Sequence, residues 1–335
     1  ACSELSTSDL TLAEVAYRCG FSDVSYFIKT FKRYKGITPH RYCMNIGFIG
    51  YGEAAFNISL GLKGEGVEGI RANDAMMNHE VMGKQVHARA EQAGVTLVES
   101  AKEVAQWADV LFAAVPSSFT MDVCNEIKGC LRPGQLYVDV SASTPATKVA
   151  IWEAIKDTGV LFADAAMLGS LPKDKHKVPI TASGNGAAKF QELMTPYGMK
   201  ITLAGEKAGS ASAIKLVRSI YMKGIAGLMI EMLQGADAYG VTEEVVASIS
   251  KSMDNIPFTS HLDRLVTGSA LHCTRRAAEL KGSIAMLDEE GLSAEMTTAT
   301  KHRLEALEPY KFAERYVDSK PAGYQEIIEA IRVKH

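Results

Sequence analysis

A glycine-rich turn directly after an apolar segment is the feature that most constrains the fold of this chain. The mainly apolar residues 45–49 are followed by Gly50-Tyr-Gly-Glu-Ala-Ala55. In this pattern the first glycine permits a tight turn, the second lets the backbone approach a pyrophosphate, and the third small residue packs a helix on a strand. The N-terminus of that helix favours negative charge. The turn therefore predicts a dinucleotide-binding site formed by Gly50, Tyr51, Gly52, Glu53 and Ala54.

The residue that follows the next predicted strand, residues 69–73, bears on which dinucleotide binds. This residue, Asp74, lies 22 positions after Gly52. A carboxylate at this place accepts hydrogen bonds from the adenosine ribose and repels a 2′-phosphate. Residues 75–78 contain no cation. The sequence therefore favours NAD as the cofactor, and NADP stays open because Arg71 or a distant loop could supply a positive charge.

Short apolar segments alternate with helical ones from Met44 to about Leu203. This alternation predicts an α/β Rossmann fold with a doubly wound, mainly parallel sheet. After Gly205 helical periodicity replaces the strand pattern, including one long helix over 207–238, so an all-α domain is expected there. The predicted domains are residues 1–43, 44–204 and 205–335. The predicted strands are 45–49, 69–73, 109–115, 136–140, 160–167, 179–182 and 200–203.

Composition narrows the class of protein. The 335 residues contain 36 Lys and Arg against 39 Asp and Glu, so no overall field favours nucleic acid or an anionic membrane. The six cysteines show neither a Cys-x-x-Cys pair nor metal-ligand spacing, which argues for free thiols and against a metal site. No apolar run approaches the length of a membrane span. We expect a cytoplasmic protein that acts on a small molecule.

Residues 1–43 follow a different pattern, with two short helices about a turn at Gly20. The residues Gly20-Phe-Ser, Tyr26-Phe, Phe31-Lys and Gly36-Ile-Thr-Pro resemble the second helix-turn-helix of AraC-type transcription regulators. The resemblance implies that residues 22–35 are a recognition helix, and Ser22 is the expected N-cap. Such regulators use two helix-turn-helix units, and the segment supplies one, with six basic and four acidic side chains. A fused remnant is therefore favoured over a working DNA-binding domain.

Three later motifs add to the glycine turn. Residues 139–145 are Asp-Val-Ser-Ala-Ser-Thr-Pro, residues 164–170 are Asp-Ala-Ala-Met-Leu-Gly-Ser, and Gly209 precedes Lys215 and Ser219. Together they resemble the β-hydroxyacid dehydrogenase family, which includes 3-hydroxyisobutyrate and 6-phosphogluconate dehydrogenases, over about residues 44–307. Within it the chain resembles a branch with a phosphogluconate-dehydrogenase-like helical domain of unassigned function. The resemblance implies a Rossmann domain, a helical domain, substrate and nicotinamide between them, and a homodimer or tetramer formed through the C-terminal helices.

The resemblance also assigns roles to two strand ends. It places Val115, Pro116 and Ser117 along the cofactor, and Ser141, with Ala142 beside it, at a carboxylate of the substrate. The alternative explanation for the hydroxyl-rich residues 141–144 is N-capping of a helix that Pro145 opens.

A third strand end departs from the family. The family's backbone nest for the acid group corresponds to Leu168, Gly169 and Ser170. Here Leu168 replaces a serine and Ser170 replaces a glycine. The pocket for the substrate carboxylate must therefore differ from the family's.

The resemblance makes Lys215 the catalytic residue, with Ser219 in place of the usual asparagine. Four residues separate them, so both lie on one helix face. An unperturbed lysine has a pKa of about 10.4 and is a poor base near neutral pH. Burial and a positively charged nicotinamide must therefore lower the pKa of Lys215. The alternative is a surface lysine on an otherwise apolar helix.

Three further cations are candidates for binding an acidic group of the substrate. Lys223 lies eight residues beyond Lys215, and the alternative for it is a solvated side chain. Arg275 or Arg276 could hold a carboxylate with two hydrogen bonds. An ordinary helix ion pair between Arg275 and Glu279 is the alternative.

The leading functional hypothesis is an NAD(P)-dependent oxidoreductase that acts on a β-hydroxy acid or the matching carbonyl. An imine reductase on the same scaffold is the second hypothesis, because the pocket at Leu168 and Ser170 is altered. A redox-responsive regulator that binds DNA through residues 1–43 is the third.

Overall fold

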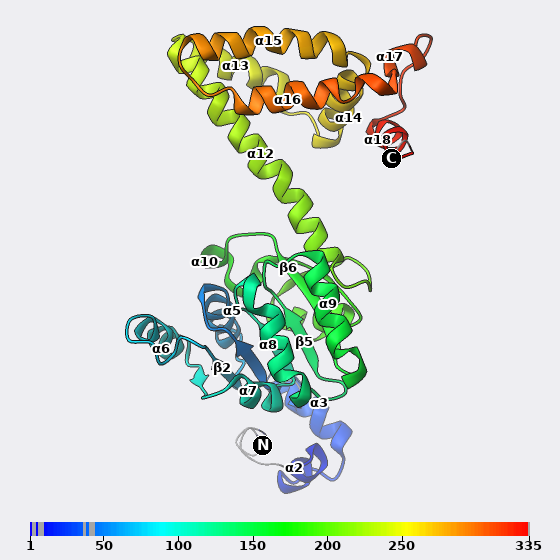
Figure 1. Cartoon of the computed structure of the whole chain (residues 1–335). Helices are drawn as coiled ribbons and strands as arrows, with labels where there is room; N and C mark the ends of the chain where they lie inside the picture. The colour runs from blue at the N-terminus through cyan, green and yellow to red at the C-terminus, as the bar shows by residue number, and fades with distance from the viewer. Residues whose placement is uncertain (2–4, 6–9, 36–37, 40–43, 334–335) are drawn as a thin grey trace. The chain divides into compact units, whose positions relative to one another are not determined.

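The computed structural model describes residues 1, 5, 10–35, 38–39 and 44–333. The chain divides into two compact units, Ala1–Arg218 and Ser219–His335 (Figure 1). The division falls inside one long helix, α12 (Ser210–Ala238). Each unit has its own architecture.

An eight-stranded sheet forms the centre of the first unit. Its spatial order is β3-β2-β1-β4-β5-β6-β7-β8, and every neighbouring pair is parallel except β6 with β7. The order reverses between β1 and β4, which makes that point the topological switch of a doubly wound sheet. The predicted fold class and strands are confirmed, and β3 is a short strand that the sequence pattern did not indicate. The strands are β1 (Ile46–Ile49), β2 (Ile70–Asn73), β3 (Thr96–Leu97), β4 (Val110–Ala113), β5 (Leu136–Asp139), β6 (Leu161–Met167), β7 (Pro179–Ser183) and β8 (Lys200–Leu203).

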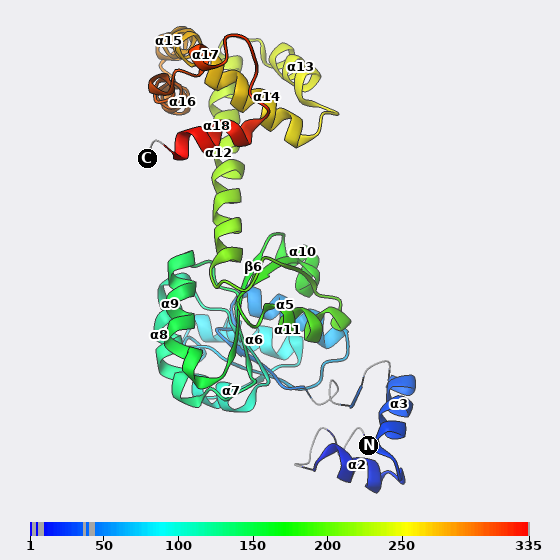
Figure 2. The same cartoon turned by 90° about the vertical axis from the view of Figure 1, so that its right-hand side faces the viewer.

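Helices cover both faces of this sheet, which explains why its central strands are apolar throughout. One core lies under α5 (Glu53–Gly64), α6 (Met82–Ala93) and α11 (Ala187–Met194). The other lies under α7 (Ala101–Trp107), α8 (Thr120–Ile127) and α9 (Pro145–Ile155). Figure 2 shows α8 and α9 on one side of the sheet and α11 on the other. A short helix, α10 (Leu171–Asp174), follows β6.

The N-terminal segment contains α2 (Leu12–Arg18) and α3 (Val24–Lys35), as the helix-turn-helix pattern predicts. Thr11 and Glu14 form a capping box at the start of α2. The prediction that Ser22 caps the second helix is wrong. Asp23 caps it instead, because its carboxylate accepts a hydrogen bond from Ser25 N–H at 2.7 Å. The two helices share a small core of Val15, Ala16, Phe27 and Phe31.

The second unit is helical, and no strand occurs among its described residues, 219–333. Beyond α12 it contains α13 (Thr242–Met253), α14 (Phe258–Leu271), α15 (Cys273–Glu289), α16 (Glu295–Glu305), α17 (Phe312–Arg315) and α18 (Tyr324–Arg332). Ala270, Phe312 and Ile327 form a buried cluster in it. Within the described residues, no helix is both long enough and apolar enough to cross a membrane.

Candidate cofactor and catalytic site

The glycine turn lies at the switch point of the sheet. Gly50 follows β1 and has a φ of +82°, which side chains other than glycine rarely adopt. A Cβ on Gly50 would lie 2.7 Å from the carbonyl oxygen of Ala114 and 2.7 Å from Val115, which follows β4. The carboxyl ends of β1 and β4 therefore meet here. Pro116 continues from Val115 into a 3-10 turn that begins at Ser117.

Gly52, unlike Gly50, lies beside open space. It is the N-cap of α5, and a Cβ built on it would meet no protein atom within 4 Å. Open space therefore lies beside the backbone at the positive end of a helix, next to Glu53 and Ala54. Such a place fits the pyrophosphate of a dinucleotide, which binds through backbone N–H groups.

Asp74 is tied to the glycine turn. Its carboxylate accepts hydrogen bonds from Tyr51 N–H at 2.6 Å and Met76 N–H at 2.8 Å. The ring of Tyr51 is fully buried, and its hydroxyl lies 2.7 Å from Ser59 Oγ. Tyr51 therefore contributes to the predicted cofactor site by holding Asp74 in place, while its side chain belongs to the core.

The sequence left Arg71, on β2, as a cation that could bind a 2′-phosphate. Its guanidinium lies over the ring of Trp107, 4.4 Å from the centroid. The carbonyl of Trp107 accepts a hydrogen bond from the side chain of Asn45, which precedes β1. Arg71 is therefore engaged at the end of the sheet opposite Gly50, away from the predicted cofactor site.

A fully buried lysine, Lys148 of α9, extends its ammonium group to the carboxyl end of β5. Its Nζ donates to the carbonyl oxygens of Asp139 (3.1 Å) and Ser141 (2.9 Å) and to Ser141 Oγ (3.2 Å). It forms ion pairs with Asp139 Oδ1 at 2.8 Å and Asp164 Oδ1 at 3.6 Å, and all three side chains are fully buried. Sequence reasoning missed Lys148. The available signal was a pair of acidic residues in buried strands. Asp139 is the last residue of β5, Asp164 lies within β6, and the two are directly paired in the sheet register.

Ser141 belongs to this buried group. Its N–H donates to Asp139 Oδ1 at 2.8 Å, and its hydroxyl lies 3.0 Å from Ser143 Oγ. The helix-capping alternative holds for Thr144, whose hydroxyl accepts from Thr147 N–H at the start of α9. Capping therefore does not explain Ser141, whose hydroxyl contacts Lys148 and Ser143 instead. Its neighbour Ala142 is exposed.

The first turn of α12 is anchored on the sheet. Asp164, on β6, accepts hydrogen bonds from Ser212 N–H at 2.9 Å and Ser212 Oγ at 2.7 Å. Ser183, on β7, donates to Asp164 at 3.3 Å and accepts from Ala211 N–H at 2.9 Å. A carboxylate and a hydroxyl of the sheet thus satisfy the otherwise unpaired N–H groups of this helix.

Lys215 lies one turn beyond Ser212 and is half-buried. Burial lowers its pKa below the ordinary lysine value, the positive charge of Lys148 lowers it further, and the negative charge of Asp164 opposes both. The direction is the one that a general base requires. The turn before the helix is also fixed, because a Cβ on Gly209 would lie 2.7 Å from the carbonyl oxygen of Pro145. Ser219 lies four residues further along α12.

The segment after β6 differs from a simple acid-binding nest. Leu168 N–H donates to the carbonyl of Pro179 at 2.8 Å, so it is committed to the backbone. Gly169 and Ser170 are exposed. A Cβ on Gly169 would lie 3.3 Å from Asp174 Oδ2, which places a negative charge beside the segment.

The remaining candidate cations lie in the second unit. Lys223 is exposed on α12. Arg275 forms the local ion pair with Glu279 on α15 that the alternative explanation predicted. Arg276 is half-buried and donates to Ser269 Oγ at 2.9 Å. Among the residues that the structure describes, no group of three or more His, Cys, Asp or Glu side chains is placed to hold a metal ion.

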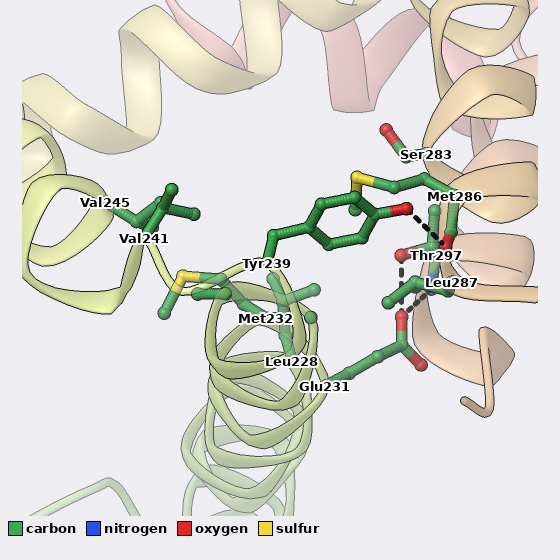
Figure 3. A pocket seen from close by; sticks show the side chains of 12 residues that line it. Leu228, Glu231, Met232, Tyr239, Val241, Val245, Ser283, Met286, Leu287 and Thr297 are labelled. Atoms are coloured by element: carbon green, nitrogen blue, oxygen red, sulfur yellow. Dashed lines mark hydrogen bonds between the residues drawn. The ribbon is translucent and has the colours of Figure 1, made fainter. Parts of the chain in front are cut away.

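The second unit also contains an apolar cavity of about 480 Å³. Glu231 and Thr297 are hydrogen-bonded at its edge, and the hydroxyl of Tyr239 donates to the carbonyl of Met286 (Figure 3). Its apolar lining includes Leu228, Met232, Val241, Val245 and Leu287.

Three segments of the chain match known families. Residues 45–143 match the family described as NADP oxidoreductase coenzyme F420-dependent. Residues 236–307 match a domain of unknown function, DUF1932. Residues 3–43 match bacterial regulatory helix-turn-helix proteins of the AraC family.

Relatives cover most of the chain at modest identity. An uncharacterized 28.5 kDa protein of Methanothermus fervidus is 27% identical over 79% of this chain and 99% of its own length. The chloroplastic glyoxylate/succinic semialdehyde reductase 2 of Arabidopsis thaliana is 27% identical over 71% of this chain and 68% of its own length.

Solved structures agree on the fold. A conserved protein of unknown function, reported to be similar in structure to 3-hydroxyacid dehydrogenases, is 29% identical and has a TM-score of 0.56. It covers 79% of this chain and 97% of its own. An imine reductase of Myxococcus stipitatus has a TM-score of 0.63 at 16% identity, over 81% of this chain and 95% of its own. At that identity the likeness concerns the fold alone.

Proposed function

The chain is an NAD(P)-binding Rossmann oxidoreductase that carries a DUF1932 domain and is similar to 3-hydroxyacid dehydrogenases, and we propose that it interconverts a β-hydroxy acid and its carbonyl. The observation that carries the proposal is Lys215. It is a half-buried lysine of lowered pKa whose electrostatic neighbours, Lys148 and Asp164, also contact Ser141 and the start of α12. The proposed general base, Lys215, and the proposed hydroxyl donor, Ser141, are therefore next to the same buried cluster of charged residues.

In the proposed reaction Lys215 moves the proton. When bound, the nicotinamide accepts a hydride from the substrate carbon in oxidation and returns it in reduction. In oxidation the neutral Nζ of Lys215 takes the hydroxyl proton as the carbonyl forms, and in reduction its ammonium returns that proton. Ser141 donates a hydrogen bond to a substrate carboxylate, and Ser219 is a second hydrogen-bonding group on the helix that carries Lys215.

We propose NAD as the preferred cofactor. Asp74 supports this choice, because its carboxylate would accept hydrogen bonds from ribose hydroxyls and repel a 2′-phosphate. The engagement of Arg71 with Trp107 also supports it, since it holds the cation of β2 away from that place.

The test measures oxidation or reduction of the nicotinamide by its absorbance. NAD and NADP are each assayed with 3-hydroxy acids, sugar acids and β-hydroxy amino acids. Lys215→Ala should lower kcat by roughly 10²- to 10⁴-fold, the usual contribution of general acid–base catalysis. The matched control is Lys207→Ala, which removes an exposed lysine just before α12 and should leave kcat unchanged. Full activity of Lys215→Ala on an accepted hydroxy acid would refute this assignment.

Reduction of an imine is the second candidate, and Asp174 favours it. Its carboxylate lies beside Gly169, where the resemblance expects the acid group of the substrate to bind. A negative charge there would repel a carboxylate and attract an iminium cation. Cyclic imines in the same assay would decide. NADH oxidation by imines, together with no reduction of NAD by any of the hydroxy acids, would replace the leading proposal.

A further inference from the structure

Lys148 requires an explanation beyond folding. It is the one lysine among the described residues that is fully buried, and burying an ammonium is unfavourable unless it is paired and hydrogen-bonded. Pairing is extensive, with two carboxylates and three further oxygen atoms as partners. Asp139 nevertheless keeps one buried oxygen, Oδ2, without a hydrogen-bond partner. Apolar side chains would fill such a place at less cost in desolvation.

One set of contacts connects Lys148 to Ser141. Lys148 Nζ donates to Ser141 Oγ at 3.2 Å, and an ammonium can only donate. Ser141 Oγ is therefore an acceptor toward Lys148, and its own hydrogen must point elsewhere. Ser143 Oγ is one acceptor at 3.0 Å, and a substrate oxygen would be another. Lys148 thus sets the hydroxyl of Ser141 to donate away from Lys148, to Ser143 or to a bound substrate.

A second set of contacts connects Lys148 to α12. Asp164 forms an ion pair with Lys148 at 3.6 Å and accepts hydrogen bonds from both the N–H and the hydroxyl of Ser212. Ser212 precedes Lys215 by three residues, so the two side chains lie on the same face of the helix. The position of the first turn of α12, and with it Lys215, therefore depends on the buried ion pairs.

We propose that Lys148 is a positioning residue, which orients the hydroxyl of Ser141 as a donor and, through Asp164, fixes the turn of α12 that carries Lys215. This inference rests on the proposed function, which makes Ser141 and Lys215 the groups that act on the substrate. The charged groups around Lys148 are Asp139 from β5 and Asp164 from β6, with Lys215 from α12 nearby. Because Lys148 and Lys215 are both cations, Lys148 also favours the neutral form of Lys215.

The decisive measurement does not need a substrate. The protonation of Lys215 is followed by its rate of acetylation with acetic anhydride at a series of pH values, with peptides read by mass spectrometry. In Lys148→Gln the midpoint for Lys215 should move to higher pH, because a like charge is lost while Asp164 remains. In the control Lys156→Gln, which removes an exposed lysine just after α9, the midpoint should stay in place. An unchanged midpoint in folded Lys148→Gln would show that neither the charge of Lys148 nor its contact with Asp164 acts on Lys215, and would overturn the proposal.

A second variant covers the case in which Lys148→Gln does not fold. The double variant Lys148→Gln/Asp139→Asn removes one cation and one anion together, so the charge of the buried group is conserved. Lys148 and Asp164, and not Asp139, are the charges that shift the pKa of Lys215, so an upward shift of the Lys215 midpoint should remain in this variant. Its absence would overturn the proposal.

Two further readouts separate positioning from a structural role. NADH affinity, measured by fluorescence titration, should be unchanged in either variant, because the Gly50 turn and Asp74 share no contact with Lys148. On an accepted hydroxy acid, the acidic limb of the kcat/KM profile should move upward together with the acetylation midpoint. Loss of NADH binding in a folded variant would mean that Lys148 only supports the fold. Failure of every substrate would refute the proposed function and leave the acetylation result to decide the role of Lys148.

Discussion

The protonation of Lys215 predicts how activity depends on pH. Burial and Lys148 lower the pKa of Lys215. In the proposed reaction oxidation needs the neutral amine of Lys215, so kcat/KM should rise with pH and level off above this pKa, at a pH below the ordinary lysine value of about 10.4. Reduction needs the ammonium, so its kcat/KM should fall over the same interval. Initial rates in both directions would check the sign. A pH-independent oxidation rate would contradict a lysine base.

The two glycines of the turn make a matched pair. Gly50→Ala forces a side chain to a φ of +82° and against the carbonyl of Ala114, so it should cost at least about 1–3 kcal/mol of unfolding free energy. Gly52→Ala adds a Cβ in open space at ordinary φ, so its stability should fall by no more than about 1 kcal/mol while NADH binding weakens. Urea denaturation and NADH titration measure the two effects. Equal effects of both substitutions on stability would contradict the geometry.

Sequence reasoning located the residues whose role depends on local conformation. Gly50 and Gly52 were predictable because a turn of this kind requires glycine at fixed spacing. Lys148 was not predictable in the same way, because in sequence it is one of several polar residues near the start of a helix. Its partners, Asp139 and Asp164, come together only through the register of β5 and β6. Two buried acids at paired positions imply a buried cation, but a single sequence does not show the pairing.

At the scale of the element, α16 depends on a carboxylate from another helix. Glu231, on α12, accepts hydrogen bonds from Met296 N–H at 2.7 Å, Thr297 N–H at 2.8 Å and Thr297 Oγ1 at 2.6 Å. Burial raises the pKa of Glu231, but these hydrogen bonds outweigh burial and hold the pKa below its usual range. Glu231→Gln should therefore lower the unfolding free energy by about 1–2 kcal/mol at neutral pH.

The pH dependence of that loss has a definite sign. A carboxylate with a lowered folded-state pKa stabilises the protein above its unfolded-state value of about 4.3, and the contribution is lost as pH falls through the folded-state pKa. The difference between the urea midpoints of the wild type and Glu231→Gln should therefore narrow below about pH 4.3. The control is Glu279→Gln, which removes an exposed ion pair and should change stability by less than about 1 kcal/mol. A difference that widens in acid would contradict this role of Glu231.

The elements themselves were largely predictable, and the exceptions have local causes. The central strands are buried on both faces, so their apolar residues mark them clearly. The two-residue β3 is too short to leave a pattern. The antiparallel direction of β7 was also invisible, because burial gives the same composition to parallel and antiparallel neighbours. The start of α3 was misplaced by one residue because Ser22 and Asp23 can both cap a helix.

At the scale of the whole molecule, the described residues of the N-terminal helices and those of the Rossmann sheet form separate hydrophobic clusters. The two clusters on the faces of the Rossmann sheet contain residues from Met44 onward. The cluster between α2 and α3 contains no residue after Phe31. Apolar burial is the main source of stability, so separate clusters indicate separate stability. Among the residues that the structure describes, the helix-turn-helix segment and the Rossmann sheet therefore share no buried cluster.

A chain that begins at Met44 should therefore bind NADH with an affinity within about twofold of the full chain, because sites without shared partners change one another's free energies by less than about 0.5 kcal/mol. Fluorescence titration of both proteins measures this, and circular dichroism confirms that the shorter one is folded. Gel shifts at low salt with the same pair test the helix-turn-helix itself. If α2 and α3 are a remnant, the two proteins should retain DNA equally poorly. A tenfold loss of NADH affinity in the folded shorter chain, or DNA retention by the full chain alone, would instead show that residues 1–43 take part in what the oxidoreductase does.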